Sequence, residues 1–336
     1  MYNKPVNDYL RFDRDIKGGG MPPVVLLSGK EQYLIEWAEK KIRARYVAEG
    51  MEVLDSQTLD PESGVGEMIE AFETLPVMSE KRVVLIRDHQ ILKSSRPAGE
   101  NKGDLEDLGA YLEHPNESVI AVFSSSETDG RSAIVKKIKK AGASYVFDEL
   151  DEKSLLGLIA KRVKAGGNEI DRRSAEYLIE ETGYYNKESD YDLFDLDNDI
   201  RKLTALSGGE PITREAISES VEGDSETFIF DMLDGISGND KRKAFEILNN
   251  RLTRDSRSGM QMIGAVVSQL EVMYETKEYM ERESLNASEI SRRTGLNEWR
   301  LKKISRYVNR YDLPKLKEML RSAYALNAKV VEGEMD

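Results

Sequence analysis

Two residues that could hold a phosphate, Gly29 and Lys30, directly follow a short apolar run, as they do in phosphate-binding loops. Such a loop needs Gly, four residues and then Gly-Lys-Ser/Thr, so that backbone N–H groups and one lysine surround the phosphates. The upstream glycine is missing here, and Glu31 stands where a hydroxyl group would hold Mg²⁺. The pattern predicts a nucleotide-binding scaffold with a degenerate site that is not expected to bind nucleotide, and therefore a binding subunit.

The other residues with reactive or metal-binding side chains do not form a catalytic pattern. His89 and His114 are the two histidines, and neither has the spacing of a Ser/His/Asp or metal site. Asp195, Asp197 and Asp199 alternate like calcium ligands, but the Gly and Glu that a calcium loop requires are absent, so the start of a helix is favoured. We expect no catalytic residue and no metal site.

Length, charge and cysteine content bound the class of protein. The chain has 336 residues, enough for two or three domains. Its net charge of -13 argues against a general nucleic-acid coat protein, although residues 285–330 carry eleven Lys and Arg against four Asp and Glu. The absence of cysteine suits a reducing compartment, and the apolar runs are too short to cross a bilayer. These features predict a cytoplasmic protein without membrane contact.

The first 148 residues alternate between two kinds of apolar pattern. Short β-branched runs bounded by polar residues are typical of parallel strands covered on both faces, and the segments between them repeat at helical spacing. This alternation predicts an α/β domain over 1–148, with a parallel sheet and flanking helices. The expected strands are 24–27, 83–86, 118–123 and 143–147, and the expected helices include 33–42, 65–72 and 134–138.

From about residue 149 the strand signals end. Three amphipathic helical patterns, over 155–163, 175–179 and 200–206, predict a small helical domain over 149–222. Ser207-Gly208-Gly209 is expected to end the third of these helices, because glycine adopts the left-handed conformation of a helix C-terminus. Helical patterns continue from near Phe228 to Leu326 and predict an all-α domain over 223–336.

The strongest signal for binding is the segment Leu75-Pro76-Val77-Met78, which lies between an expected helix and the strand that follows it. Pro76 stops the helix, and the next two residues are apolar where a connection is normally solvated. Exposed apolar side chains at a helix end suit insertion into the pocket of a partner. The alternative is that Val77 and Met78 fold back onto the sheet, because single apolar loop residues are ordinary.

A second interpretation concerns residues 287–308, which read as a helix-turn-helix with Gly295 at the turn. A basic second helix of this kind suits the major groove of DNA, and the same spacing also serves ordinary packed helix pairs. The basic residues that are candidates for contact with DNA or with a neighbouring subunit are Arg292, Arg293, Arg300, Lys302, Lys303 and Arg306.

Four segments, taken in order, resemble one known family. They read LLSGKEQYLIEWAEKKI, ETLPVMSEKRVVLI, DLDNDIRKLTALSGGEPIT and LNASEISRRTGLNEWRLKKISRYVNRYDLPKLKEML. This series resembles the delta-subunit family of the bacterial DNA polymerase III clamp loader, over nearly the whole chain. The resemblance implies an AAA+-like first domain without ATPase activity, a helical lid domain and a helical collar domain that joins the subunits of a pentamer.

The resemblance also implies a function and a set of partners. Leu75, Pro76, Val77 and Met78 would form a wedge that binds the beta sliding clamp and opens the ring for loading onto primed DNA. Gamma/tau and delta-prime subunits would complete a hetero-pentamer, and ATP and Mg²⁺ would bind to these partners and not to this chain. The chain would have no active site of its own and would belong to the DNA polymerase III holoenzyme, a nucleotidyltransferase complex. The alternatives are a helix-turn-helix regulator and an NTPase with a divergent site.

Overall fold

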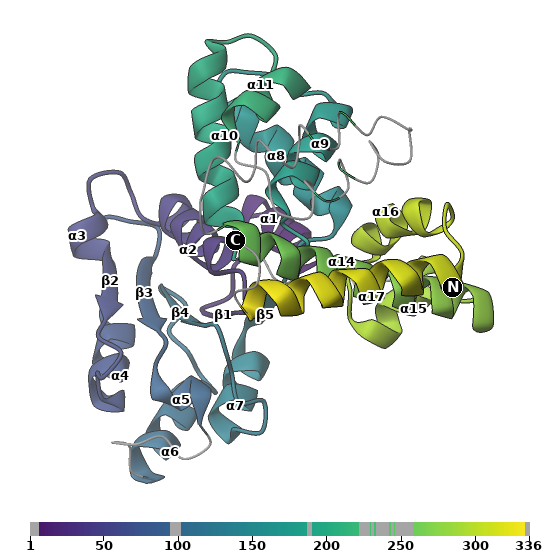
Figure 1. The fold of residues 1–336 in the computed structure, drawn as a ribbon. Helices are drawn as coiled ribbons and strands as arrows, with labels where there is room; N and C mark the ends of the chain where they lie inside the picture. The colour runs from purple at the N-terminus through teal and green to yellow at the C-terminus, as the bar shows by residue number, and fades with distance from the viewer. Residues whose placement is uncertain are drawn as a thin grey trace. The chain divides into compact units, whose positions relative to one another are not determined.

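The computed structural model describes residues 7–94, 102–186, 190–221 and 258–332, together with the isolated positions Ile229, Met232, Arg242 and Phe245. The chain divides into two compact units, Met1–Gly157 and Leu158–Asp336. Figure 1 shows the strands of the first unit and the helices of both.

A five-stranded parallel sheet forms the centre of the first unit (Figure 1). Its strand order is β2-β3-β4-β1-β5, so β2 and β5 are the edges. All four neighbouring pairs are parallel, which confirms the predicted sheet. The strands are β1 (Val24–Ser28), β2 (Ser56–Leu59), β3 (Arg82–Arg87), β4 (Val119–Ser125) and β5 (Ala143–Val146).

Burial explains which strands the sequence reveals. Every residue of β1 and of β4 is buried, as expected for strands covered on both faces. The edge strand β2 was not predicted, because it reads Ser-Gln-Thr-Leu and buries a single side chain, that of Leu59. A polar edge strand lacks the continuous apolar run by which a buried strand is recognised.

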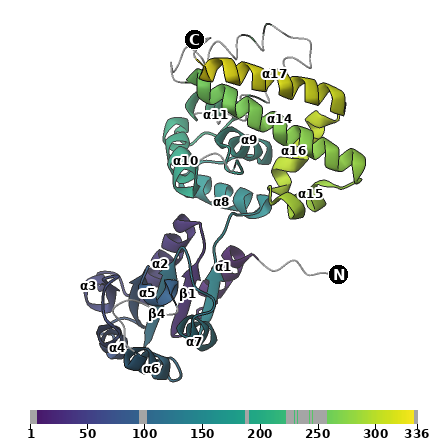
Figure 2. The same ribbon diagram turned by 60° about the horizontal axis from the view of Figure 1, so that its bottom comes forward.

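Helices cover both faces of this sheet (Figures 1 and 2). Successive side chains of a strand point to opposite faces, so Val24 and Leu26 of β1 pack into one core while Val25 and Leu27 face the other. The helices α4 (Val65–Glu73), α6 (Lys102–Tyr111) and α7 (Ala133–Ala141) contribute to the first core, and α1 (Asp8–Lys17) and α2 (Gln32–Tyr46) contact the sheet and each other. The short helices are α3 (Glu52–Asp55) and α5 (Gln90–Lys93).

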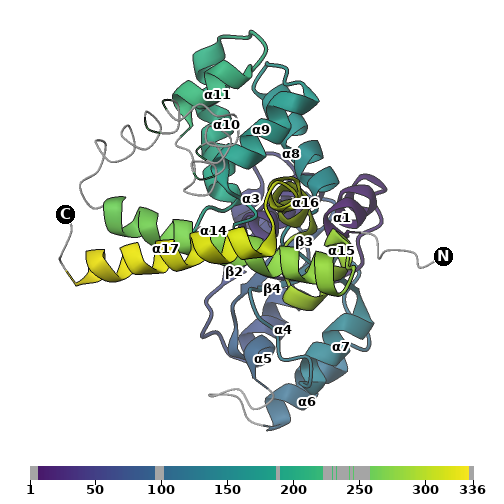
Figure 3. The ribbon, with the colours of Figure 1, turned by 45° about the vertical axis from the view of Figure 1, so that its right-hand side comes forward.

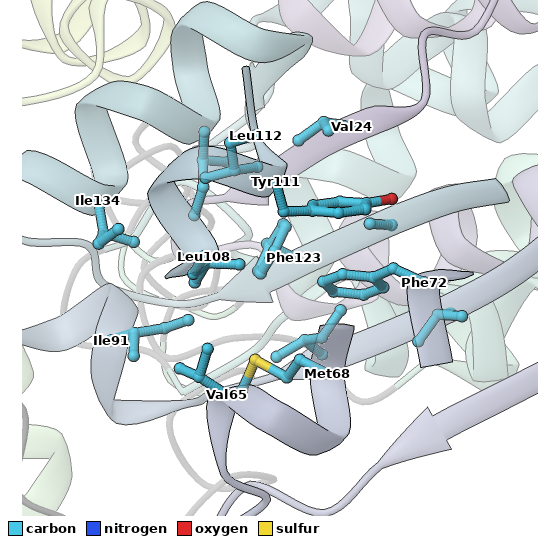
Figure 4. Packing of buried hydrophobic residues seen from close by; sticks show 14 of the residues in the cluster. Val24, Val65, Met68, Phe72, Ile91, Leu108, Tyr111, Leu112, Phe123 and Ile134 are labelled. Carbon is cyan, nitrogen blue, oxygen red and sulfur yellow. The ribbon is translucent and has the colours of Figure 1, made fainter. Parts of the chain in front are cut away.

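Aromatic side chains lie at the centre of the first core (Figure 4). The ring of Phe72, on α4, lies 5.2 Å from that of Tyr111 and 6.0 Å from that of Phe123, measured between centroids. Phe72 and Phe123 are fully buried. These contacts fix the last turn of α4 against the sheet, and so they fix the point from which the next loop departs.

The second unit is built from helices. The first group is α8 (Glu152–Ala165, which begins in the first unit), α9 (Arg172–Thr182), α10 (Leu193–Ser207) and α11 (Arg214–Ser220); the second is α14 (Ser258–Arg282), α15 (Ala287–Thr294), α16 (Glu298–Val308) and α17 (Leu313–Val331). Gly208 ends α10 in the left-handed conformation, with φ of 56°, as predicted. The long helices α14 and α17 lie side by side (Figures 2 and 3).

The three-domain division stays a prediction. Its boundary between residues 222 and 223 lies outside the described residues, and so does most of the helix expected from near Phe228. In the parts of the chain that the structure describes, no helix is both long enough and apolar enough to cross a membrane.

Replacing Phe72 with Ala tests the aromatic core. We expect F72A to lower the free energy of unfolding of the first unit by ~3–5 kcal/mol, because a large buried ring is lost and leaves a cavity. Trp37 lies in the first unit and Trp299 in the second. Urea unfolding followed by Trp37 fluorescence, in a W299F background, therefore reports the first unit. Leu75→Ala, at an exposed site, serves as the control; an equal loss in both variants would contradict the packing role of Phe72.

Candidate functional site

The loop that follows α4 presents apolar side chains to solvent. The helix ends at Glu73, and Thr74 is already extended, as expected shortly before a proline. The exposed fractions of Leu75, Val77 and Met78 are 62%, 64% and 73%. The alternative that Val77 and Met78 fold back onto the sheet is therefore wrong. Residues 75–78 are called the docking loop below.

A buried carboxylate holds the docking loop in place. Asp55, the last residue of α3, is fully buried. Its Oδ1 accepts a hydrogen bond from the backbone N–H of Val77 at 2.6 Å, and its Oδ2 accepts from the N–H groups of Met78 at 3.1 Å and Ser79 at 2.9 Å. Three consecutive N–H groups thus converge on one side chain that lies 22 to 24 residues earlier in the chain.

These hydrogen bonds also set the charge of Asp55. Burial by itself raises the pKa of a carboxyl group, but hydrogen bonds from the side chain of Ser79 and from the three backbone N–H groups outweigh burial and lower the pKa of Asp55 to about 2. The group is therefore ionised at neutral pH, and its hydrogen bonds are charge-assisted and stronger than neutral ones.

Further contacts anchor the C-terminal side of the docking loop. The backbone N–H of Ala48 donates to the hydroxyl oxygen of Ser79 at 2.9 Å. Arg45, near the end of α2, forms an ion pair with Glu80 at 2.7 Å. The loop is consequently tied to α2 and α3 by polar contacts, while its apolar side chains take no part in these bonds.

The structure adds residues that sequence reasoning missed. Val53 and Leu54, on α3, have exposed fractions of 91% and 51%. They directly precede Asp55, so they lie beside the anchor of the docking loop. A local pattern could not reveal them, because α3 has four residues, too few for an amphipathic repeat.

Asp55→Asn tests the anchor. The asparagine amide would either place its NH₂ group opposite the N–H groups of Met78 and Ser79 or leave these N–H groups without a partner. Hydrogen bonds to charged groups contribute ~1.5–3 kcal/mol each to stability. We expect hydrogen exchange of the backbone N–H groups at 77–79 to accelerate roughly tenfold or more. Asp60→Asn, which changes an exposed aspartate that accepts a bond from the N–H of Glu62, is the control. Unchanged exchange at 77–79 would contradict the anchoring role.

The same anchor predicts a dependence on acid. Because folding lowers the pKa of Asp55 from 3.8 to about 2, its stabilising contribution is complete above about pH 4 and is lost as the pH falls from there towards 2. An NMR titration of the Asp55 carboxyl carbon should give a midpoint near 2 in the folded protein. A midpoint near 4 would show that the loop does not hold the ionised form.

The residues that resemble a phosphate-binding loop are engaged by the chain itself. The N–H of Glu31 donates to the carbonyl oxygen of Phe147 at 3.0 Å, and the N–H of Lys30 faces a carboxylate oxygen of Asp148 at 3.4 Å. Gly29 has φ of 125°, and a Cβ built there would lie 2.1 Å from the oxygen of Phe147. Two of the N–H groups that would face a phosphate therefore already face acceptors of this chain, one of them negatively charged.

A second polar network occupies the neighbouring part of the sheet's carboxyl edge, where open α/β sheets bind their ligands. The buried carboxylate of Glu39, on α2, accepts from the hydroxyl of Ser124 at 2.7 Å and from the guanidinium Nε of Arg87 at 3.0 Å. The hydrogen bond to Glu39 raises the pKa of Arg87. This network links α2 to the ends of β3 and β4 through the protein's own charges.

The alternating aspartates after residue 190 support a helix start, as expected. Asp192 caps α10 in a capping box with Asp195. The buried carboxylate of Asp197 forms ion pairs with Arg162 at 3.0 Å and Arg201 at 2.6 Å, and Asp199 accepts from the hydroxyl of Tyr191 at 2.8 Å. Among the described residues, no cluster of three or more His, Asp or Glu side chains is arranged to hold a metal ion.

The six basic candidate residues of the second unit lie on α15 and α16 but differ in environment. Arg293 pairs with Glu283, Lys302 with Glu298 at 3.0 Å and Lys303 with Glu180 at 3.8 Å. Arg300 has an exposed fraction of 4%, so a surface contact through it is not supported. Arg292 and Arg306 are exposed.

The helix pair that resembled a helix-turn-helix is packed into its unit. Gly295 ends α15 with φ of 70°, as the turn was expected to require. The ring of Trp299, on α16, lies 5.3 Å from that of Tyr185, and Ile304 and Val308 are buried against α14 and α17. This packing accounts for the apolar spacing without a DNA-binding role.

Comparison with known proteins identifies the family. Residues 26–148 match the model of the "DNA polymerase III, delta subunit" family, and residues 226–336 match that of the "DNA polymerase III delta subunit, C-terminal domain". The two models together cover more than two thirds of the chain. They include the docking loop, residues 29–31 and the basic helices α15 and α16.

Individual relatives agree with these models. The chain is 22% identical to the DNA polymerase III subunit delta of Bacillus subtilis, over 80% of this chain and 76% of the relative. It is 23% identical to the probable DNA polymerase III subunit delta of Aquifex aeolicus, over 68% and 64%. The solved structure of a Bacillus subtilis DNA clamp loader delta protein has the same fold, with a TM-score of 0.60 and 20% identity over 96% of this chain and 94% of that one. The chain thus belongs to the DNA polymerase III delta subunit family and is a clamp-loader subunit.

Proposed function

We propose that this chain binds the ring-shaped beta sliding clamp through the docking loop and opens the ring for loading onto primed DNA. The observation that carries the proposal is the exposure of Val77 and Met78 on a loop whose backbone is held by a buried charge. Exposed apolar side chains on a rigid backbone suit a protein pocket, because little conformational entropy is lost on binding.

Opening of a ring requires no chemistry from this chain. A binding protein shifts a ring between closed and open states through its differential affinity for them. A wedge that fits the open geometry better than the closed one stabilises the open state by the difference between the two binding free energies. The docking loop, held by Asp55, would provide such a fixed shape.

The energy for the cycle comes, in this proposal, from partner subunits. Gamma/tau and delta-prime subunits would complete a cytoplasmic hetero-pentamer and bind the ATP and Mg²⁺. The engagement of residues 29–31 with Phe147 and Asp148 favours a chain without its own nucleotide. Primed DNA would pass through the complex, and the exposed Arg292 and Arg306 are the members of the basic set best placed to meet phosphates.

Titration of the purified chain with Mg-ATP separates this proposal from a divergent NTPase. We expect no saturable binding at millimolar nucleotide, because the phosphates would have to displace the oxygen of Phe147 and approach the carboxylate of Asp148. The fluorescence of a nucleotide analogue in the presence of the chain, with and without excess ATP, is the measurement. Binding that ATP displaces would support the NTPase alternative.

Replacing Val77 and Met78 of the docking loop with aspartate tests clamp binding. We expect V77D together with M78D to abolish capture of the purified beta clamp, because two carboxylates would have to be buried in an apolar pocket. The backbone N–H groups that donate to Asp55 remain in this variant, so the fold should be retained. Leu206→Asp, in the second unit, is a control of similar exposure at 66%. Undiminished capture by the double variant would contradict the docking-loop assignment.

A further inference from the structure

We propose that Val53 and Leu54 of α3 form, with the docking loop, one continuous apolar surface that binds the same clamp subunit. The inference rests on the proposed function and extends it to a second segment of the chain. The family resemblance points to the loop alone, whereas exposure, hydrogen bonding and apolar area point to α3.

The first observation is the clustering of exposed apolar side chains. In the described part of the first unit, seven large hydrophobic side chains are exposed, and five of them lie on α3 and the docking loop. These five are Val53, Leu54, Leu75, Val77 and Met78, and the other two are Leu10 and Val146. Single exposed apolar residues are normal, but a cluster of this kind marks an interaction site.

The second observation is that hydrogen bonds tie the two segments together. Leu54 directly precedes Asp55, whose carboxylate lies 2.6 Å from the backbone nitrogen of Val77. In addition, the guanidinium group of Arg82 donates to the carbonyl oxygen of Leu54 and, at 2.8 Å, to the side-chain oxygen of Gln57. Val53 and Leu54 are thereby held beside the docking loop independently of their own side chains.

The exposed fractions also indicate how much apolar area the surface offers. An exposed aliphatic side chain offers on the order of 100 Å² of apolar surface, so the three apolar residues of the docking loop offer roughly 300 Å². A specific interface buries about 800 Å² per partner, part of it polar. Val53 and Leu54 raise the apolar part to roughly 500 Å², which brings the surface near the apolar share of such an interface.

The charges around this surface indicate the chemistry of the partner. Glu49 precedes α3, Glu52 is the first residue of α3, Glu73 precedes the docking loop, and all three are exposed. An interface commonly has an apolar centre and a polar rim. We expect the matching surface of the clamp to be an apolar groove with basic residues at its edge, and its association with this chain to weaken as salt concentration rises.

Protection of single cysteines tests the proposal directly, because the chain has no cysteine of its own. Three variants are compared, V53C, V77C and L206C, each modified by a maleimide with and without saturating beta clamp. The rate is followed by mass on the peptide of this chain. We expect the clamp to slow modification at both 53 and 77 at least roughly tenfold, and to leave 206 unchanged.

The pair of sites separates the two proposals. Protection at 77 without protection at 53 would overturn the role of α3 and leave the docking loop as the clamp contact. Protection at neither site, with the clamp present at saturating concentration, would overturn both. Protection at 53 and 77 together is the result that the continuous surface requires.

Affinity gives a second, independent measure. We expect V53S with L54S to weaken clamp binding by about tenfold, because two side chains of the proposed surface lose their apolar atoms. Both residues are exposed, so the substitutions should change the stability of the fold little. Leu10→Ser, at the exposed apolar site on α1, is the control and should leave the dissociation constant unchanged. A dissociation constant for V53S with L54S within twofold of the unmodified chain would overturn the proposal.

Discussion

The hydrogen bonding of the buried Asp55 carboxylate is the interaction on which the shape of the docking loop depends. Without it, residues 77–79 would have three N–H groups and no partner within the chain for them, and the loop would be free to change shape. A charge in the interior is costly unless hydrogen bonds satisfy it, and here the loop backbone supplies them. The charge and the loop therefore stabilise each other, and the apolar side chains of the loop are left to face outward.

Internal hydrogen bonds and charges also engage the edge of the sheet where the phosphate-binding pattern lies. Glu39 ties Arg87 and Ser124 together at the carboxyl edge of the sheet, and Phe147 and Asp148 engage the residues that would face a phosphate. The sheet and its helices are retained, and their polar groups serve the chain itself.

Much of the fold follows from apolar patterning alone. The four strands β1, β3, β4 and β5 are short apolar runs, and the helices α2, α4 and α7 repeat at helical spacing, so each could be predicted. The strand β2 could not, because its side chains are mostly polar. The helix α6 has a weak amphipathic pattern, with Gly103 and Gly109 among its ten residues, and it was missed for that reason.

The site was predictable only in part. The apolar character of Val77 and Met78 is visible in the sequence, but the hydrogen bonds that their N–H groups donate to Asp55 are not, because nothing local connects residues that lie more than twenty positions apart. The burial of Arg300 is equally invisible, since arginine in a basic helix normally faces solvent. Tertiary packing decides which distant residues come into contact, and local sequence patterns do not predict these contacts.

The geometry of the Asp55 anchor has a consequence for how this surface can evolve. The anchor engages backbone N–H groups, which every amino acid except proline carries. Residues 77 and 78 can therefore exchange one side chain for another of different size without disturbing the support beneath them. Descendants of this chain could follow gradual changes in a partner's pocket by substitution at these positions, while a proline at either would remove an N–H group on which the support relies.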